Sequence, residues 1–385
     1  MHGLLVLDEG LQDQVKQTGL KVFANTTGDN MAPGFVEGLL AVYTKNKEIV
    51  ESAFSNDKQF CSALDISFAA VVNHRPSLSQ PCKSAELLAK CCDILLKKSA
   101  DGPDEAQIDV KLDGCFKILA YLNEKEEFEM FYSAFLAKRL IQENSRSMDA
   151  EETMTNRFKD VSGRKFTDEL QRTITDISVS ADLNKEFNNI FQKDQHEPGI
   201  DFSVRVLQSR ALPLEHSSQA VDFTVPQELE NRAKSFEDFY SNHYHKHRKL
   251  AWLDPMSTVE MKVNCFQKSY DITMQIPPMK LLLMFEKTNS MTCQELETAT
   301  QLDPAHFQAS LQILVDSQLV TVSCNPSEIF EPLAIISLNL AFSHEQSKFK
   351  LPFVDMKDPI QEAEQIRCAV KENRINFLQV GIFVF

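Results

Sequence analysis

Residues 126–141 read Glu-Glu-Phe-Glu-Met-Phe-Tyr-Ser-Ala-Phe-Leu-Ala-Lys-Arg-Leu-Ile, and this stretch predicts a buried helix. Apolar residues recur at three- and four-residue intervals and form two adjacent stripes, the first made of Phe128, Phe131, Phe135 and Leu136 and the second of Met130, Ala134, Ala137 and Ile141. Glutamates in the first turn and Lys138 and Arg139 in the last suit the helix dipole. A helix that is apolar on two sides needs a neighbour on each, so we expect it in the middle of a bundle.

The composition is that of an ordinary globular protein, with 43% hydrophobic and 25% charged residues in a chain of 385. This length allows roughly two to four domains, each with its own core. The net charge of -15 argues against nucleic acid or anionic lipid as a partner of the whole surface. We therefore expect neither a nucleic acid nor a membrane among the partners.

Nine cysteines are scattered along the chain, and none is spaced as Cys-x-x-Cys. An odd number without metal or redox spacing fits a reducing compartment. The apolar run Leu4–Leu7 is too short for a signal peptide, and no other run approaches the length of a membrane span. We expect a cytoplasmic or nuclear location.

The first half of the sequence predicts helices separated by short breaks. Helical periodicity covers residues 1–75, which we assign to a first helical region. A linker rich in proline and serine follows, and Ser84 opens a further run of amphipathic helices. Residues 80–198 are therefore predicted to form a helical bundle.

From residue 199 the pattern changes to strict alternation. Phe202, Val204 and Val206 alternate with polar residues, which is typical of a half-buried strand, and further strand candidates are residues 249–253 and Tyr270–Gln275. Val221, Phe223 and Val225 repeat the alternation, and Gln227–Tyr240 is predicted to be helical. Residues 199–275 thus predict a small mixed α/β unit.

Residues 276–352 predict a winged-helix domain. Its three helices are expected at Met279–Glu286, at 292–300 and at 303–318, and its hairpin at 319–322 and 333–342. Residues 353–385 are assigned to a linker and the truncated start of a second winged helix. The expected fold is mainly α with a small mixed α/β unit: a helical bundle, a sheet domain and a winged helix in an elongated arrangement.

Several blocks of the sequence resemble the cullin family, and within it the branch that serves Skp and F-box adaptors. The blocks are residues 86–99, 128–140 with Phe-Tyr-Ser-x-x-Leu-Ala-Lys-Arg-Leu, 166–183 with Asp-Ile-Ser-Val-Ser, 201–207 and 249–253. The resemblance extends over nearly the whole chain. It implies a non-catalytic scaffold of a cullin-RING ubiquitin ligase, whose carboxyl-terminal half binds a RING-box protein that recruits the ubiquitin-conjugating enzyme for ubiquitin-dependent protein degradation.

The resemblance also implies how the RING-box protein binds. In the family, an extended strand of that protein inserts into a small sheet, here expected from residues 201–207, 249–253 and 270–275. The residues predicted to contact it are Phe202, Val204, Val206, Leu250 and Trp252. Backbone hydrogen bonds between the inserted strand and the sheet would supply affinity, and contacts with alternate side chains would supply specificity. The alternative is that these residues form a core within the chain, because that arrangement needs the same alternation.

The two ends of the sequence resemble incomplete family elements. Leu4–Val15 is similar to a helix of the last adaptor-binding repeat, and Glu372–Phe385 is similar to the helix that would carry the neddylation lysine. We therefore expect neither adaptor binding nor neddylation of this chain. An alternative function is a truncated, non-neddylated decoy that sequesters RING-box protein. The family's Gly-x-Trp-Pro turn is replaced by Arg210-Ala-Leu-Pro213.

Four lysines resemble parts of a basic groove that attracts the acidic tail of the conjugating enzyme in the family. They are Lys97, Lys98, Lys348 and Lys350. Such attraction would mainly accelerate encounter. The alternative for Lys97 and Lys98 is that they lie at a helix carboxyl end as partners of its dipole.

Other chemistry finds little support. His243, His245 and His247 have no cysteine or carboxylate at metal-motif spacing, and no nucleotide, hydrolase or metalloprotease motif occurs, so we expect no metal, cofactor or catalytic residue. DNA binding by the winged helix is a further alternative. Residues 289–347 contain no lysine or arginine, however, and phosphate contacts need positive charge.

Overall fold

The structure is a computed structural model. It describes residues 2–25, 31–77, 80–99, 104–194, 201–208, 226–244, 248–253, 256–286, 288–323, 330–353 and 363–372. The chain divides into two compact units. Unit 1 draws on Met1–Asp182, Arg205–Glu215 and Ala363–Phe385, and unit 2 on Leu183–Val204 and His216–Glu362.

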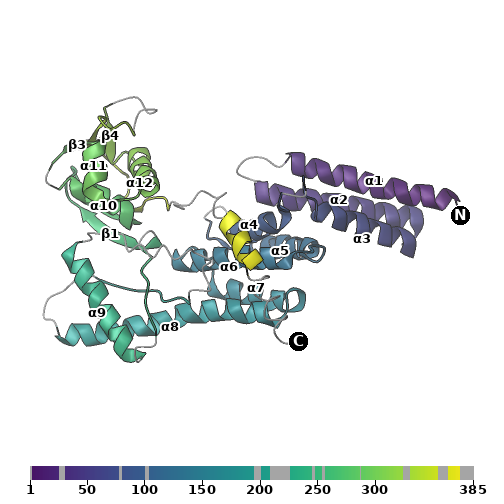
Figure 1. Ribbon diagram of the computed structural model, residues 1–385, viewed down its shortest axis with the longest axis horizontal. Helices are drawn as coiled ribbons and strands as arrows, with labels where there is room; N and C mark the ends of the chain where they lie inside the picture. Colours follow the sequence, from purple (N-terminus) through teal and green to yellow (C-terminus); the bar gives the residue numbers. More distant parts are fainter. Residues whose placement is uncertain are drawn as a thin grey trace. The chain divides into compact units, whose positions relative to one another are not determined.

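Unit 1 is built of helices packed around one continuous hydrophobic core. Its helices are α1 His2–Asn25, α2 Met31–Phe54, α3 Lys58–Val72, α4 Ser84–Leu96, α5 Glu105–Leu119, α6 Lys125–Ile141, α7 Met148–Val161, the first part of α8 Arg164–Asp194, and a helix over residues 363–372. Helices α1, α2 and α3 run side by side (Figure 1). The core continues from these helices through α4, α5 and α6 to α8.

Helix α6 is central in unit 1, as the two apolar stripes predicted. Phe128, Phe131, Tyr132 and Leu136 are at most 2% exposed, and α6 packs extensively against α4. The rings of Tyr132 and Phe158 lie 4.7 Å apart in an edge-to-face contact. Aromatic contacts of this kind add to the free energy of area burial, so α6 anchors the bundle.

Several helices begin at residues that satisfy their first backbone N–H groups. The side chains of Asp57, Asp104 and Ser147 accept hydrogen bonds from the first turns of α3, α5 and α7, respectively. Gly163 separates α7 from α8 with a φ of 81°, which residues with a Cβ rarely adopt. These local choices fix the positions at which the chain turns.

A buried ionic network connects α6 to α4 and α7. The Arg139 guanidinium is 0% exposed; it donates to both carboxylate oxygens of Glu151 at 2.9 Å and to Oδ1 of Asp93 at 2.7 Å. Ser145 donates to Glu151 Oε1 at 2.6 Å. Burial opposes the charge of Arg139, but the carboxylates of Glu151 and Asp93 raise its pKa above the ordinary value. Sequence reasoning placed Arg139 only at the helix end and missed this network.

The half-buried carboxyl group of Glu129 makes the stability of unit 1 depend on pH. Burial raises its pKa to about 7, and the neighbouring carboxylates Glu126 and Glu169 act in the same direction, whereas the nearby Ser162 hydroxyl lowers it. The folded chain therefore binds more protons than the unfolded chain between the ordinary pKa of 4.5 and about 7. Glu129 costs stability as pH rises through this window.

We expect Glu129→Gln to raise the free energy of unfolding by roughly 1 kcal/mol at pH 8, after allowance for solvent screening, and by much less at pH 5. Urea unfolding at both pH values checks this. The matched control is Glu152→Gln, which changes an exposed glutamate of α7. Equal effects of the two variants at pH 8 would contradict the assignment.

The described residues of unit 2 form two small sheets. Strands β1 Thr258–Val263, β2 Tyr270–Gln275 and β6 Lys348–Lys350 form a sheet of order β1-β2-β6, in which β1 is antiparallel and β6 parallel to β2. Strands β3 Ser290–Thr292, β5 Ile335–Leu338 and β4 Val320–Val322 form an antiparallel sheet of order β3-β5-β4. The described part of unit 2 also contains α9 Gln227–His243, α10 Ile276–Met284, α11 Cys293–Thr300 and α12 Pro304–Asp316.

The helices and hairpin expected between residues 276 and 352 are present. Thr292 and Glu295 form a reciprocal capping box at the start of α11, and Asp303 caps α12 through its side chain. The core combines α10, α11 and α12 with Ile336 and Leu338 of β5. The mainly α fold with a small α/β unit is confirmed, while the bounds of the five predicted domains stay a prediction.

The composition of the first sheet corrects one expectation. Residues 201–207 and 249–253 were expected to join Tyr270–Gln275, but only the last forms a strand, and its partners are β1 and β6. Alternation predicted the half-buried state of Phe202, Val204 and Val206 correctly. It could not tell which groups bind the backbone, since a chain lying along a helix shows the same period of two. Val221–Val225 lies outside the described residues.

Candidate functional site

The candidate site is an extended segment, residues 201–208, that lies along helix α8. Val204 is bound twice by the carboxamide of Asn184: its N–H donates to Oδ1 and its C=O accepts from Nδ2, both at 2.8 Å. The Val206 N–H donates to Oγ of Ser180 at 2.8 Å, and the Gln208 N–H donates to Oδ2 of Asp176 at 3.1 Å. Side chains of a helix thus bind every second residue of the segment.

The spacing of these contacts follows from backbone geometry. Asp176, Ser180 and Asn184 are four residues apart, which places them on one face of α8, with a rise of about 6.0 Å between neighbours. Two residues of an extended chain advance about 6.6 Å. Because the two repeats nearly match, the segment stays in register while running antiparallel to α8. We call Asp176, Ser180 and Asn184 the α8 ladder.

The opposite edge of the segment carries backbone groups that no described residue binds. In an extended chain the N–H and C=O groups of successive residues point to opposite edges. Since Val204 and Val206 face α8, the corresponding groups of Ser203, Arg205 and Leu207 face away from it. Within the part of the chain that the structure describes, no hydrogen bond reaches these groups. This outward edge is a template for another strand.

One end of the segment rests on aromatic side chains. The ring of Phe202 lies 6.2 Å from that of Phe187 and 6.3 Å from those of Phe236 and Trp252. Phe236 is fully buried, whereas Phe202 and Trp252 are half-buried. Trp252 also donates from Nε1 to Glu237 at 2.5 Å. The predicted contact residues Phe202 and Trp252 therefore lie together on a partly accessible apolar surface.

The other predicted contact residues are placed as follows. Val204 and Val206 are half-buried on the segment, and Leu250 is half-buried in residues 248–253, where no described residue forms a strand. The side chain of Arg205 pairs with Glu143 and donates to the carbonyl of Ile141. Sequence reasoning missed the α8 ladder. The sequence signal for the α8 ladder is a set of small polar residues that are poor helix formers. They recur every four residues in a helix that is followed by an alternating extended segment.

Two models of one family match this chain. The model described as the cullin alpha solenoid domain matches residues 1–184, and the one described as the cullin alpha+beta domain matches residues 206–342. The chain belongs to the cullin family. The α8 ladder thus lies at the end of the first cullin domain, and the second begins within the extended segment.

Curated cullins match over nearly the whole chain. Cullin-1 of Dictyostelium discoideum is 32% identical over 392 residues, and Cullin-2 of Caenorhabditis elegans is 30% identical over 397. Cullin-1 of Schizosaccharomyces pombe is 30% identical over 392. Each alignment covers 99% of this cullin chain and 50% of the relative, so the chain spans about half the length of the curated relatives it matches.

The four lysines assigned to a basic groove are mostly engaged in this cullin. Lys97 pairs with Asp93 at 2.7 Å, and Lys98 donates to the carbonyl of Glu143 at 3.1 Å. Lys348 donates to both oxygens of Glu260 at 2.7 and 2.8 Å. Lys350 has no ion pair among the described residues. Pairing reduces the positive electrostatic potential with which these lysines would attract an acidic tail. Their assignment to a basic groove stays a prediction.

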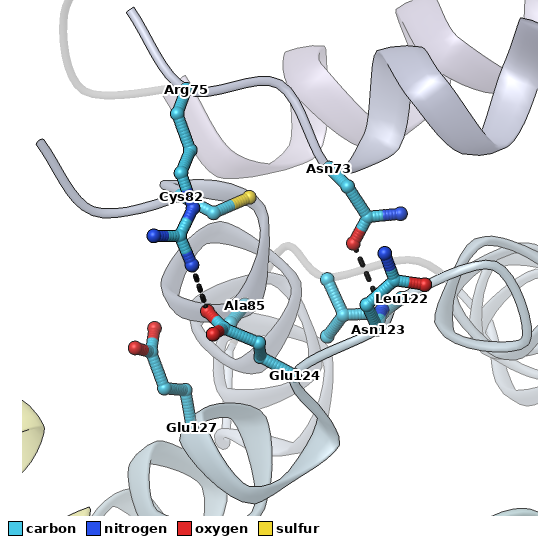
Figure 2. A pocket seen from close by; sticks show the side chains of 8 residues that line it. All are labelled: Asn73, Arg75, Cys82, Ala85, Leu122, Asn123, Glu124 and Glu127. Carbon is cyan, nitrogen blue, oxygen red and sulfur yellow. Dashed lines mark hydrogen bonds and ion pairs between the residues drawn. The ribbon is translucent and has the colours of Figure 1, made fainter. Parts of the chain in front are cut away.

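A pocket of about 130 Å³, lined by both polar and apolar residues, lies in unit 1 of the cullin chain (Figure 2). Arg75 pairs with Glu124 at 2.5 Å across it, and the Asn123 N–H donates to Oδ1 of Asn73 at 2.8 Å. Glu127 projects its carboxylate from the first turn of α6 on the same side as Arg75. These contacts connect the end of α3 to the start of α6. We therefore interpret the pocket as part of the packing between these helix ends and not as a ligand site.

Metal and membrane chemistry find no support among the described residues. No group of three metal-ligating side chains occurs there, and His243, which ends α9, lies 3.7 Å from Glu186. His245 and His247 lie outside the described residues. None of the described helices has the length and hydropathy needed to cross a membrane.

Proposed function

We propose that this cullin chain is a non-catalytic scaffold of a ubiquitin ligase, and that it binds a RING-box protein by strand addition to the segment 201–208. The observation that carries the proposal is the outward edge at Ser203, Arg205 and Leu207, which presents N–H and C=O groups beside half-buried apolar side chains. An added strand would satisfy these groups. It would draw specificity from contacts with Phe202, Val204, Val206, Leu250 and Trp252.

The proposed role is one of placement. A RING-box protein held on this edge would recruit the ubiquitin-conjugating enzyme, so the chain would raise the effective concentration of the charged enzyme near a substrate. No covalent step is assigned to the chain itself. Residues 289–347 contain no lysine or arginine, and this composition supports protein packing rather than DNA binding for that region.

Size-exclusion chromatography with light scattering, applied to the purified chain mixed with a purified RING-box protein, tests the proposal. We expect an equimolar complex. A RING-box protein lacking its extended strand is the matched control and should not co-elute. If the intact RING-box protein fails to bind the folded chain, or binds equally well without its strand, the proposal is wrong.

A further inference from the structure

Helix α8 takes the place of a neighbouring strand for residues 201–208. An extended chain normally stays ordered because a second strand binds its backbone and offsets the conformational entropy lost when each residue is fixed. Here the side chains of Asp176, Ser180 and Asn184 bind the backbone instead. The segment is thereby held extended before any partner arrives.

Asn184 is the most specific member of the α8 ladder. Its carboxamide both donates to and accepts from the backbone of Val204, which is the pattern a neighbouring strand would offer. Ser180 is 1% exposed; its Oγ accepts from the Val206 N–H and donates to the carbonyl of Asp176 at 2.7 Å. These contacts therefore select which edge of the segment faces α8.

Selection of the edge also sets the register. A slip by one residue would turn Ser203 and Arg205 toward α8 and move the side chains of Val204 and Val206 to the other face. The Phe202 ring, packed on Phe187 and Phe236, opposes such a slip. The outward groups of Ser203, Arg205 and Leu207 are therefore fixed by contacts on the inward edge.

We propose that Ser180 and Asn184 are positioning residues that keep the outward edge of residues 201–208 preformed for the strand of a RING-box protein. The inference rests on the proposed function and adds to it the groups that prepare the site. Neither side chain needs to touch the partner. Their effect would appear in the rate of association, because a chain that is only partly in the competent conformation binds more slowly and more weakly.

The test compares Ser180→Ala/Asn184→Ala with Ser178→Ala/Asn189→Ala. The control makes the same changes at exposed positions of α8, and alanine favours the helix in both variants. The ladder variant loses the hydrogen bonds of Ser180 and Asn184 to the segment, so we expect it to bind purified RING-box protein roughly ten- to hundredfold more weakly. The loss should lie mainly in the association rate constant, and the control should match wild type.

A second variant separates positioning from folding. Asn184→Asp keeps an oxygen that accepts from the Val204 N–H but loses the donor to its C=O, so its association rate should fall between those of wild type and Asn184→Ala. Hydrogen exchange of the Val204 and Val206 amides in the unbound chain should be faster in the alanine variant.

Three results would overturn the inference. Unchanged association by the ladder variant, or a loss confined to the dissociation rate constant, would show that the ladder does not prepare the edge, while the proposed function would stand. If wild type and the control both fail to bind RING-box protein, the proposed function and this inference fall together.

Discussion

Replacing Arg139 by leucine will lower the free energy of unfolding of the helical unit by roughly 3–5 kcal/mol. The guanidinium is fully buried and is the cation that faces both Asp93, 4% exposed, and Glu151, 0% exposed. Removing it takes from Glu151 its two guanidinium hydrogen bonds and leaves Asp93 paired with the partly exposed Lys97. It also removes a cation 5.6 Å from the ring centroid of Tyr132. Urea unfolding followed by far-ultraviolet circular dichroism measures the loss.

Two further variants test the cause of this loss. Arg139→Lys keeps the charge but cannot bind Glu151 through two parallel hydrogen bonds, so its stability should be intermediate. The triple variant Arg139→Leu/Asp93→Leu/Glu151→Leu should be less destabilised than Arg139→Leu alone, because it leaves no buried carboxylate unpaired. If the three substitutions lower the free energy of unfolding additively, the three side chains do not form a coupled network. Arg139 would then stabilise the unit only through packing.

Replacing Ser203 by proline should weaken binding of the RING-box protein at least about a hundredfold. Proline removes an outward N–H and places a ring carbon where the added strand would approach. The bonds of Val204 and Val206 to α8 are on the other edge and are retained. Ser203 is exposed, so we expect no significant change in thermal stability. Titration calorimetry with purified RING-box protein gives the affinity.

Ser203→Ala is the control for this prediction. It keeps the N–H and removes only a hydroxyl that makes no hydrogen bond with any described residue. It should bind as wild type does. Full affinity of the proline variant would place the partner elsewhere on the chain.

The sequence predicted most of the helices because their signals are local. The apolar stripes of residues 126–141 placed α6 in the core, and Thr292 and Asp303 marked the starts of α11 and α12. Strand Tyr270–Gln275 was also predicted correctly. Period and caps depend on neighbouring residues, so one sequence suffices to find them.

Contacts between distant residues could not be predicted in the same way. Arg139 and Glu151 are ordinary charged residues in sequence, and only folding brings them together without water. Ser180 and Asn184 would be equally ordinary on a solvated helix face. The alternation of residues 201–207 was recognised, but its backbone partners are side chains of α8 rather than a strand. Periodicity identifies a half-buried extended chain and leaves its neighbours undetermined.

Residue-resolved hydrogen exchange of residues 201–208, with and without RING-box protein, tests the central claim most directly. We predict that the amides of Val204 and Val206 are protected in the unbound chain, whereas those of Ser203, Arg205 and Leu207 exchange freely and become protected in the complex. A complex in which these three amides still exchange freely would contradict strand addition at the outward edge.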